Sequence, residues 1–335
     1  MPGRHTTQLL PGALIGLGLL CACNGADRGT EAPTVEATDF CLTTDCAERI
    51  PLVGIPDAEN IHFTPEGRLF VTGGSNVYEI TQLGELQFEA TPLTEAGCNF
   101  TGMAQREDTL YVVCGDGQLF AAPLEDVGSM APIFQMDGMC IANGTALGPD
   151  GHIYVVDEPL DPSCLPPAPK IVRLRVDPAD PMRIQAQELW LEGSAAGTMP
   201  VGLGTSSRFP SGLAVLGNRF YSTDGGTIFA VDLLEDGSAG PVEPLFFEAT
   251  AHDDLSIAGD SLLVTDFFFG RILQLSLEGD LLQESPPLLF SFPSAVQHGQ
   301  PPMFRPDDIL VTEKGLLLEQ NLPIDQLSLY RRTDR

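Results

Sequence analysis

A hairpin-like stretch recurs six times along this chain with nearly constant spacing. In its clearest copy, Gly148-Pro149-Asp150-Gly151 has the chemistry of a type I turn, and residues 153–156 favour a strand. Each copy has an oxygen-bearing residue, here called the anchor, where its first strand begins: Glu59, Thr101, Asn143, Ser211, Asp253 and Ser294. The anchors are 42, 42, 68, 42 and 41 residues apart, which is typical of a repeat architecture.

Each repeat contains enough strand-forming sequence for four strands. A third apolar strand follows most hairpins, as at residues 76–80 and 227–231, and a weaker fourth strand precedes the next anchor, as at residues 188–191. The pattern predicts an all-β fold, a six-bladed β-propeller of four-stranded antiparallel blades over residues 49–335. Residues 50–55 precede the first anchor and are expected to complete the last blade. Two stacked β-sandwiches are the alternative, but they do not account for a period that persists through the whole chain.

The N-terminus is typical of an exported protein. Arg4 precedes an apolar run at residues 13–20, and Leu20-Cys21-Ala22-Cys23 resembles a bacterial lipobox with Cys23 as the lipidated residue. We therefore expect a lipoprotein signal peptide at residues 1–22 and a flexible polar tether at residues 23–48. The predicted location is the bacterial cell envelope, as a lipid-anchored periplasmic or outer-membrane protein. An ordinary signal peptide is the alternative and also places the protein outside the cytoplasm.

The charge balance narrows the range of partners. The chain has 46 acidic and 17 basic residues, for a formal net charge of −29. Such a charge repels nucleic acid and anionic membrane surfaces. We expect no nucleic-acid partner, membrane contact only through the lipid anchor, and a monomeric protein.

Six cysteines follow Cys23, and pairing is expected in an oxidising compartment. Two of them lie three residues before an anchor, on the rim where the second strand of the same blade ends. The predicted disulfides are Cys98–Cys114, Cys140–Cys164 and, by elimination, Cys41–Cys46. Metal binding by these thiols is the alternative, although their spacings match no zinc pattern.

The longest interval between anchors contains insertions at residues 158–170 and 193–209. We expect both to overhang the same rim as a partial lid, with disorder as the alternative. Several second strands end in an acid near this rim, and these acids are predicted to cap blade turns: Asp157, Asp224, Asp266 and Glu313.

The six anchors are predicted to converge, because the starts of the innermost strands of a propeller surround one mouth of its central channel. All six anchor side chains carry oxygen. Calcium binds six to eight carboxylate, carbonyl and water oxygens. The sequence therefore predicts a site for Ca²⁺ or another divalent cation at this mouth.

From residue 50 to about 315 the chain resembles the gluconolactonase/regucalcin-like (SMP-30-like) propellers and their paraoxonase and strictosidine-synthase-like relatives. In that group a Glu in blade one, an Asn in blades three and four, and an Asp in blade five hold calcium. Glu59, Asn143 and Asp253 match that pattern, and Ser211 departs from it although Gly212 fits. The resemblance implies a metal site formed by Glu59, Asn143, Ser211 and Asp253.

The resemblance also implies hydrolysis of a small-molecule lactone or ester. The metal would polarise the carbonyl group while Asp253 or Asp254 activates water. Thr101 stands where paraoxonases have a catalytic histidine, so their histidine dyad is absent, and we place Thr101 among the substrate-binding residues. Phe267 and Phe268 are expected to form an apolar wall, with packing under a neighbouring loop as the alternative. A non-catalytic propeller that binds a ligand or an envelope protein remains the alternative function.

Overall fold

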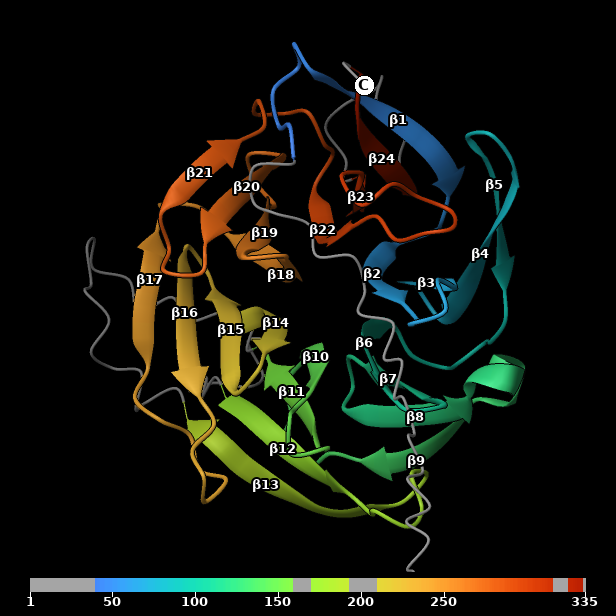
Figure 1. The fold of residues 1–335 in the computed structure, drawn as a ribbon. Coiled ribbons are helices and arrows are strands. Elements are labelled where there is room, and N and C mark those ends of the chain that lie inside the picture. Colours follow the sequence, from blue (N-terminus) through green and yellow to red (C-terminus); the bar gives the residue numbers. More distant parts are fainter. Residues whose placement is uncertain (1–39, 159–169, 193–209, 316–324, 334–335) are drawn as a thin grey trace, which may run out of the picture. The chain divides into compact units, whose positions relative to one another are not determined.

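The computed structural model describes residues 40–158, 170–192, 210–315 and 325–333, and these form six four-stranded antiparallel sheets around a channel (Figure 1). The predicted six-bladed β-propeller is confirmed. All of these described residues belong to one compact unit. The predicted signal peptide and Cys23 lie outside the described residues. No helix among the described residues is long and apolar enough to cross a bilayer.

The strands follow one another blade by blade, from the channel outward. Blade one contains β2 (Ala58–Phe63), β3 (Leu69–Gly73), β4 (Asn76–Gly84) and β5 (Gln87–Pro92). Blade two contains β6 (Phe100–Arg106), β7 (Thr109–Cys114), β8 (Gln118–Pro123) and β9 (Ala131–Gln135), with the 3₁₀ helix η2 (Leu124–Ser129) between its last two strands. Blade three contains β10 (Ala142–Leu147), β11 (Ile153–Asp157), β12 (Lys170–Val176) and β13 (Ile184–Glu192).

The second half of the chain repeats this order. Blade four contains β14 (Pro210–Leu216), β15 (Arg219–Asp224), β16 (Thr227–Asp232) and β17 (Glu243–Phe247). Blade five contains β18 (His252–Ala258), β19 (Ser261–Asp266), β20 (Arg271–Ser276) and β21 (Leu281–Glu284). Blade six contains β22 (Pro293–His298), β23 (Ile309–Glu313), β24 (Gln326–Arg332) and β1 (Ala47–Gly54).

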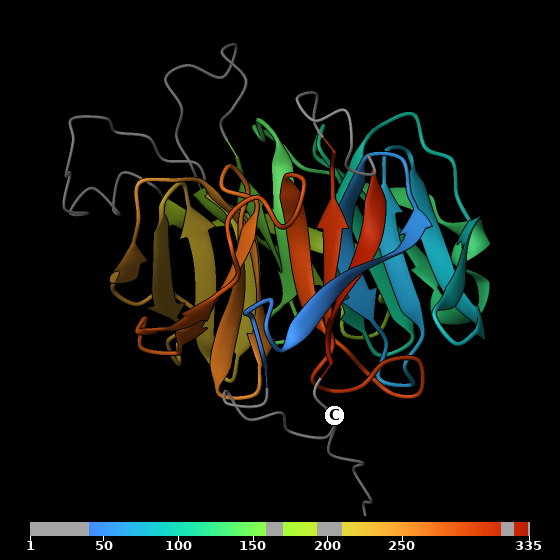
Figure 2. The ribbon, with the colours of Figure 1, turned by 90° about the horizontal axis from the view of Figure 1, so that it is seen from above.

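The two ends of the described chain close the ring, as the sequence predicted. Strand β1 pairs antiparallel with β24, so the N-terminal strand is the outer strand of the last blade (Figure 2). Arg49 on β1 forms a buried ion pair with Glu313 at the end of β23, with a nitrogen–oxygen distance of 2.7 Å. The closing strand is therefore held by a charged contact as well as by its backbone ladder.

The hydrophobic core lies between neighbouring blades. Between blades four and five, for example, Tyr221 and Ile228 pack with Leu255 and Val264 in one buried cluster. Burying a large aliphatic or aromatic side chain contributes about 1.5–3 kcal/mol, so each interface between sheets stabilises the ring strongly. The central strands are buried on both faces, as the unbroken buried pattern of β7 and β19 shows.

The folded part of the chain begins earlier than the sequence suggested. Phe40 and Leu42 are buried in the same cluster as Tyr330 of β24. The backbone of Leu42 also accepts a hydrogen bond from the Tyr330 hydroxyl at 3.1 Å. The predicted tether at residues 23–48 is thus too long at its C-terminal end, because the apolar side chains at residues 40 and 42 pack onto the propeller.

Two of the predicted disulfides form, Cys41–Cys46 and Cys98–Cys114. Cys140 is also disulfide-bonded, and Cys164, its predicted partner, lies outside the described residues. Most of both predicted lid insertions, at residues 159–169 and 193–209, lies outside the described residues as well.

Candidate functional site

A register irregularity interrupts the inner hairpin of every blade at its anchor. In blade three, Ala142 pairs with Asp157, but the next pair is Thr145 with Val155, so two residues oppose one around Asn143. Irregularities at the corresponding position occur in the other five blades. A bulge of this kind bends the strand and changes the direction of a side chain. The bulges therefore present the anchor side chains at the channel mouth.

A threonine on the second strand supports this bulge in four blades. Its hydroxyl oxygen accepts a hydrogen bond from the amide that follows the anchor, at 2.8 to 2.9 Å. The four pairs are Thr72 with Asn60, Thr223 with Gly212, Thr265 with Asp254, and Thr312 with Ala295. The repeated threonine near the end of the second strand thus satisfies a backbone donor that the bulge removes from the ladder.

Three of the four predicted metal ligands form a hydrogen-bonded chain across blades three, four and five. The side-chain nitrogen of Asn143, Nδ2, donates to Ser211 Oγ at 3.0 Å, and Ser211 Oγ donates to Asp253 Oδ1 at 2.8 Å. Ser211 therefore joins its two neighbours directly. Because the side-chain nitrogen of Asn143 is used in this way, its side-chain oxygen, Oδ1, remains the atom suited to a cation.

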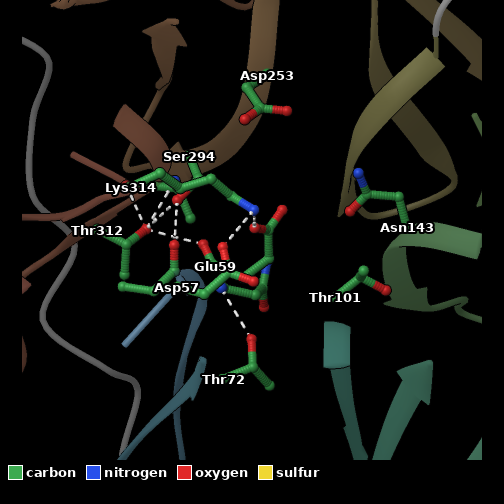
Figure 3. A network of polar contacts seen from close by, with 12 residues as sticks. Asp57, Glu59, Thr72, Thr101, Asn143, Asp253, Ser294, Thr312 and Lys314 are labelled. Carbon is green, nitrogen blue, oxygen red and sulfur yellow. Dashed lines mark hydrogen bonds and ion pairs between the residues drawn. The ribbon is translucent and has the colours of Figure 1, made fainter. Parts of the chain in front are cut away.

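The fourth predicted ligand, Glu59, is paired with a lysine. The side chain of Glu59 is only 9% exposed, and it forms an ion pair with the ammonium group of Lys314 from blade six (Figure 3). Lys314 Nζ also lies 3.3 Å from Asp57 Oδ1. A positive charge thus stands within the ring of anchors.

A further carboxylate joins the ring from blade three. Glu158 Oε2 accepts a second hydrogen bond from the Asn143 amide, at 3.0 Å. Together with Glu59 and Asp253, it gives the ring three acidic side chains from three different blades. Asn143, Asp253 and Glu59 surround the channel mouth in Figure 3. We refer to Glu59, Asn143, Glu158, Ser211 and Asp253 as the polar ring.

Burial weakens the acidity of all three carboxylates in the polar ring. It raises the pKa of Glu59 to about 7, with a contribution from the charge of Asp253 and against the effect of Lys314. Burial and the charge of Glu158 raise the pKa of Asp253 to about 7, and burial also raises the pKa of Glu158 to about 7. Burial lowers the pKa of Lys314, but the adjacent Glu59 outweighs it and the net shift is upward, so the amine stays protonated. When all three carboxylates are ionised, the ring carries more negative charge than the single ammonium group of Lys314 neutralises.

The other two anchors connect neighbouring blades. Thr101 Oγ1 donates to the Ala142 carbonyl at 2.7 Å, and Ser294 Oγ donates to the Ala58 carbonyl at 2.8 Å. Each acceptor is the residue before the anchor of the next blade. The hydroxyl proton of Thr101 is therefore committed to a backbone contact, although its side chain lies at the mouth where the sequence predicted it (Figure 3).

Asp254, the second candidate for water activation, lies on β18 and contacts blade one through its carboxylate. Its Oδ2 accepts a hydrogen bond of 3.4 Å from Asn60 of blade one. Burial raises its pKa well above the ordinary range of an aspartic acid. Asp254 also packs closely against Gly212 of blade four, where a β-carbon would lie 2.7 Å from it. Asp254 is thus more enclosed and more easily protonated than a free carboxylate.

The predicted apolar wall lies beside the polar ring. Phe267 packs against Phe268 and Phe292, with ring centroids 5.6 and 5.1 Å away, and Phe268 is 63% exposed. The Phe292 carbonyl accepts a hydrogen bond from the amide of Lys314. An exposed aromatic surface therefore adjoins the residue that contacts Glu59.

Glu158 and Lys314 were not among the residues predicted for this site, yet one structural rule places both there. The amide of the residue after the second strand donates to the carbonyl two residues before the anchor in five blades; the donors are Gly74, Gly115, Glu158, Phe267 and Lys314. The available sequence signal was the acid that ends the second strand in blades three to six, because the next residue lies on the same rim. A separate cavity of about 560 Å³ between blades one and two, lined by Tyr78 and Phe120 among others, contains none of the polar ring.

No family model and no curated protein matches the sequence. Solved structures do match it. A calcium-binding regucalcin from Agrobacterium tumefaciens is 12% identical with a TM-score of 0.64, covering 87% of this chain and 94% of that one. A gluconolactonase from Xanthomonas campestris is 14% identical with a TM-score of 0.63, covering 86% of this chain and 90% of that one.

A luciferin-regenerating enzyme is 17% identical with a TM-score of 0.63, covering 86% of this chain and 95% of that one. At these identities the shared property is the fold. The protein is a six-bladed β-propeller of the architecture found in the gluconolactonase and regucalcin structures, and the resemblance expected from the sequence is confirmed at that level.

The polar ring has the chemistry of a divalent-cation site. Its donors are carboxylate, amide and hydroxyl oxygens, which are the ligands of hard cations. The three carboxylates lie close enough to raise one another's pKa. A divalent cation would remove that repulsion. The residues present therefore fit such an ion, with Lys314 as an additional cation at one side of the ring.

Proposed function

We propose that this protein is a lactone or ester hydrolase that depends on calcium or a similar divalent cation bound at the mouth of the propeller. The observation that carries the proposal is the convergence of Glu59, Asn143, Ser211 and Asp253 from four blades. Glu158 supplies a further carboxylate to the same ring. The shared fold with gluconolactonase structures supports the choice of reaction, although fold alone does not define an activity.

In this proposal Asp253 accepts the proton of the attacking water. Ser211 donates to only one of its oxygens, Oδ1, so Oδ2 remains for the water. A bound cation would polarise the substrate carbonyl group. Water would add to the carbonyl carbon, the acyl carbon–oxygen bond would break, and Asp253 would return the proton to the leaving oxygen. The product would be a hydroxy acid from a lactone, or an acid and an alcohol from an ester. Asp254 is the second candidate for this role, and one of its carboxylate oxygens accepts a hydrogen bond from Asn60.

The aromatic surface suggests where the organic part of the substrate lies. We assign the apolar part of a neutral lactone or ester to Phe267 and Phe268, because these rings adjoin the polar ring and one of them is largely exposed. Thr101 is assigned to the same mouth as a contact for the polar part of the substrate. A neutral substrate also suits a protein with a formal net charge of −29.

We also propose that the protein is anchored by a lipid at Cys23 in the bacterial cell envelope. The disulfides support an oxidising compartment. Radiolabelled palmitate should be incorporated by the wild-type protein and not by Cys23→Ser. Incorporation into the serine variant would contradict the assignment.

Three measurements test the hydrolase proposal. Protein purified without chelator should contain one divalent ion per chain by mass spectrometry. It should also hydrolyse at least one member of a panel of γ- and δ-lactones and aryl esters, and Asp253→Ala should abolish that turnover while the fold is retained. Asp260→Ala is the matched control, because Asp260 is exposed on the turn at the opposite end of the same hairpin. A metal-free protein without turnover on any substrate would overturn the proposal.

One observation favours the second candidate, a binding module without catalysis. The ion pair between Lys314 and Glu59 supplies a cation to the ring from within the protein. In that case the ring would be a structural element of a propeller that captures a ligand or an envelope protein. Normal stability without metal, together with no turnover, would support this candidate.

A further inference from the structure

The position of Lys314 in the fold is specific. It follows the last residue of β23, and its amide donates to the Phe292 carbonyl at 3.1 Å. Glu158, which follows β11, makes the same backbone contact in blade three. In blades one and two the corresponding residues are glycines, Gly74 and Gly115. The backbone contact that positions the carboxylate of Glu158 at the mouth in blade three therefore positions the ammonium group of Lys314 there in blade six.

The contacts of Lys314 are those expected of a bound cation. Its ammonium group pairs with Glu59 and lies 3.3 Å from Asp57 Oδ1, and its side chain is only 20% exposed. Its charge also acts on Asp253 and Glu158. Lys314 thus brings a positive charge to the polar ring, and this charge acts on all three ring carboxylates.

A divalent ion bound by Glu59 would need the carboxylate that Lys314 already contacts. Like charges a few ångströms apart repel strongly where water is largely excluded. The ammonium group and the metal ion are therefore competing partners of one carboxylate. A lysine side chain has four rotatable carbon–carbon bonds, so it can leave Glu59 while keeping its contact with Asp57 nearer the solvent.

We infer that Lys314 is an internal competitor of the divalent cation, which pairs with Glu59 in the metal-free protein and must move aside when the ion binds. The inference rests on the cation site of the proposed function. It gives Lys314 two effects of opposite sign, because the ammonium group stabilises the metal-free ring and weakens the binding of the ion. The site would consequently fill only at higher concentrations of the ion than the same ring without the lysine.

Two other roles are less consistent with the structure. A nucleophilic amine must be unprotonated, but the amine of Lys314 forms an ion pair with Glu59. A purely structural ion pair would need only one carboxylate, whereas Lys314 interacts with Glu59, Asp57 and Asp253. The arrangement is that of a tethered cation within an acidic ring.

The test is calorimetric titration of the chelator-treated protein with calcium chloride alone. Lys314→Met should bind Ca²⁺ at least tenfold more tightly than the wild type, and Lys314→Arg, which retains the charge, should not. Without metal, Lys314→Met should have a lower melting temperature than the wild type, and saturating Ca²⁺ should close or reverse that difference. Lys314→Gln repeats the test with a side chain that can still hydrogen-bond to Glu59.

The outcomes separate this inference from the proposed function. Equal or weaker Ca²⁺ binding by both neutral variants would overturn the inference while leaving a metal site in the wild type. If only the neutral variants, Lys314→Met and Lys314→Gln, bind Ca²⁺, the inference is supported. The wild-type protein would then not use Ca²⁺ in the proposed hydrolysis. No binding by any variant would overturn both. Glu59→Gln/Lys314→Met is the control, because it should regain metal-free stability and bind no Ca²⁺.

Discussion

The hydroxyl of Ser211 donates a 2.8 Å hydrogen bond to Asp253 and accepts one from the Asn143 amide. Ser211 of blade four therefore fixes the side chains of Asn143 in blade three and Asp253 in blade five. The resemblance to calcium-binding propellers predicts an asparagine in blade four. In this protein the shorter side chain of Ser211 joins the ring by hydrogen bonds to Asn143 and Asp253.

We predict that Ser211→Ala lowers the stability of the metal-free protein by about 1–3 kcal/mol, because it leaves two partly buried polar groups without this partner. It should also weaken Ca²⁺ binding, which calorimetry measures. Ser211→Asn is the informative comparison, since it supplies the amide found in blade three. An alanine variant with unchanged stability and affinity would show that the hydrogen-bonded chain does not order the ring.

The threonines that support the bulges should be important for stability. Thr265→Val retains the shape of the side chain but removes the acceptor for the amide of Asp254, and we expect a loss of about 1–3 kcal/mol in urea unfolding. Thr81→Val, at an exposed position on β4, is the control and should change stability by less than about 0.5 kcal/mol. Equal effects of the two substitutions would contradict the supporting role.

The Cys98–Cys114 disulfide replaces a carboxylate contact. In blade three, Asp157 at the end of the second strand accepts a 2.6 Å hydrogen bond from the amide of Cys140, three residues before the anchor. Cys114 ends the second strand of blade two, and Cys98 lies three residues before its anchor. The same two positions are thus joined by different chemistry in the two blades.

From this equivalence we predict that Cys98→Ser/Cys114→Ala lowers the unfolding free energy by about 2–4 kcal/mol, as expected for a short disulfide loop. Cys98→Ser/Cys114→Asp should lose less, because the new carboxylate can accept the amide of residue 98 as Asp157 does in blade three. Denaturant unfolding of both variants checks this. The idea fails when the aspartate variant is the less stable of the two.

Acid should destabilise the protein in part through buried histidines. Burial lowers the pKa of His62, whose ring nitrogen lies 3.0 Å from Gln105 Oε1. A histidine with a lowered folded-state pKa contributes stability that is fully present above its unfolded pKa of about 6.5 and is lost as the pH falls through the folded value. Urea unfolding at pH 7.5 and pH 5.0 should therefore show a smaller acid loss for His62→Gln than for the wild type.

His298 provides an independent check, because burial lowers its pKa as well and it lies in another blade. His298→Gln should also reduce the acid loss, and the double variant should reduce it further. An unchanged acid loss in the double variant would assign the pH dependence to other groups.

The periodicity of the sequence was sufficient to predict the architecture. The anchor spacing predicted six blades, and the strand before the first anchor predicted the closure that β1 and β24 form. The anchors were also correct as positions, because the innermost strand of every blade must begin at the same mouth. The acids predicted to cap blade turns do so at Asp157 and Glu313, which accept backbone amides.

The composition of the site was less predictable. All six anchors occupy equivalent positions in the repeat, so the sequence does not distinguish Thr101 and Ser294 from the others. The hydroxyls of these two residues nevertheless donate to backbone carbonyls of the next blade. Glu158 and Lys314 each follow an acid at the end of a strand, a pattern that marks the rim but does not identify their partners. Their contacts with the ring depend on residues 15 and 255 positions away, Asn143 and Glu59.

The sequence by itself determined the number of blades, the strand order and the mouth at which the anchors meet, because these follow from a local pattern repeated along the chain. Only the tertiary structure decided which side chains share a contact and what charge results. Ion pairs and burial depend on distances across the channel, and a repeat does not encode them. The pairing of Lys314 with Glu59 is therefore a property of the closed ring rather than of either segment of sequence.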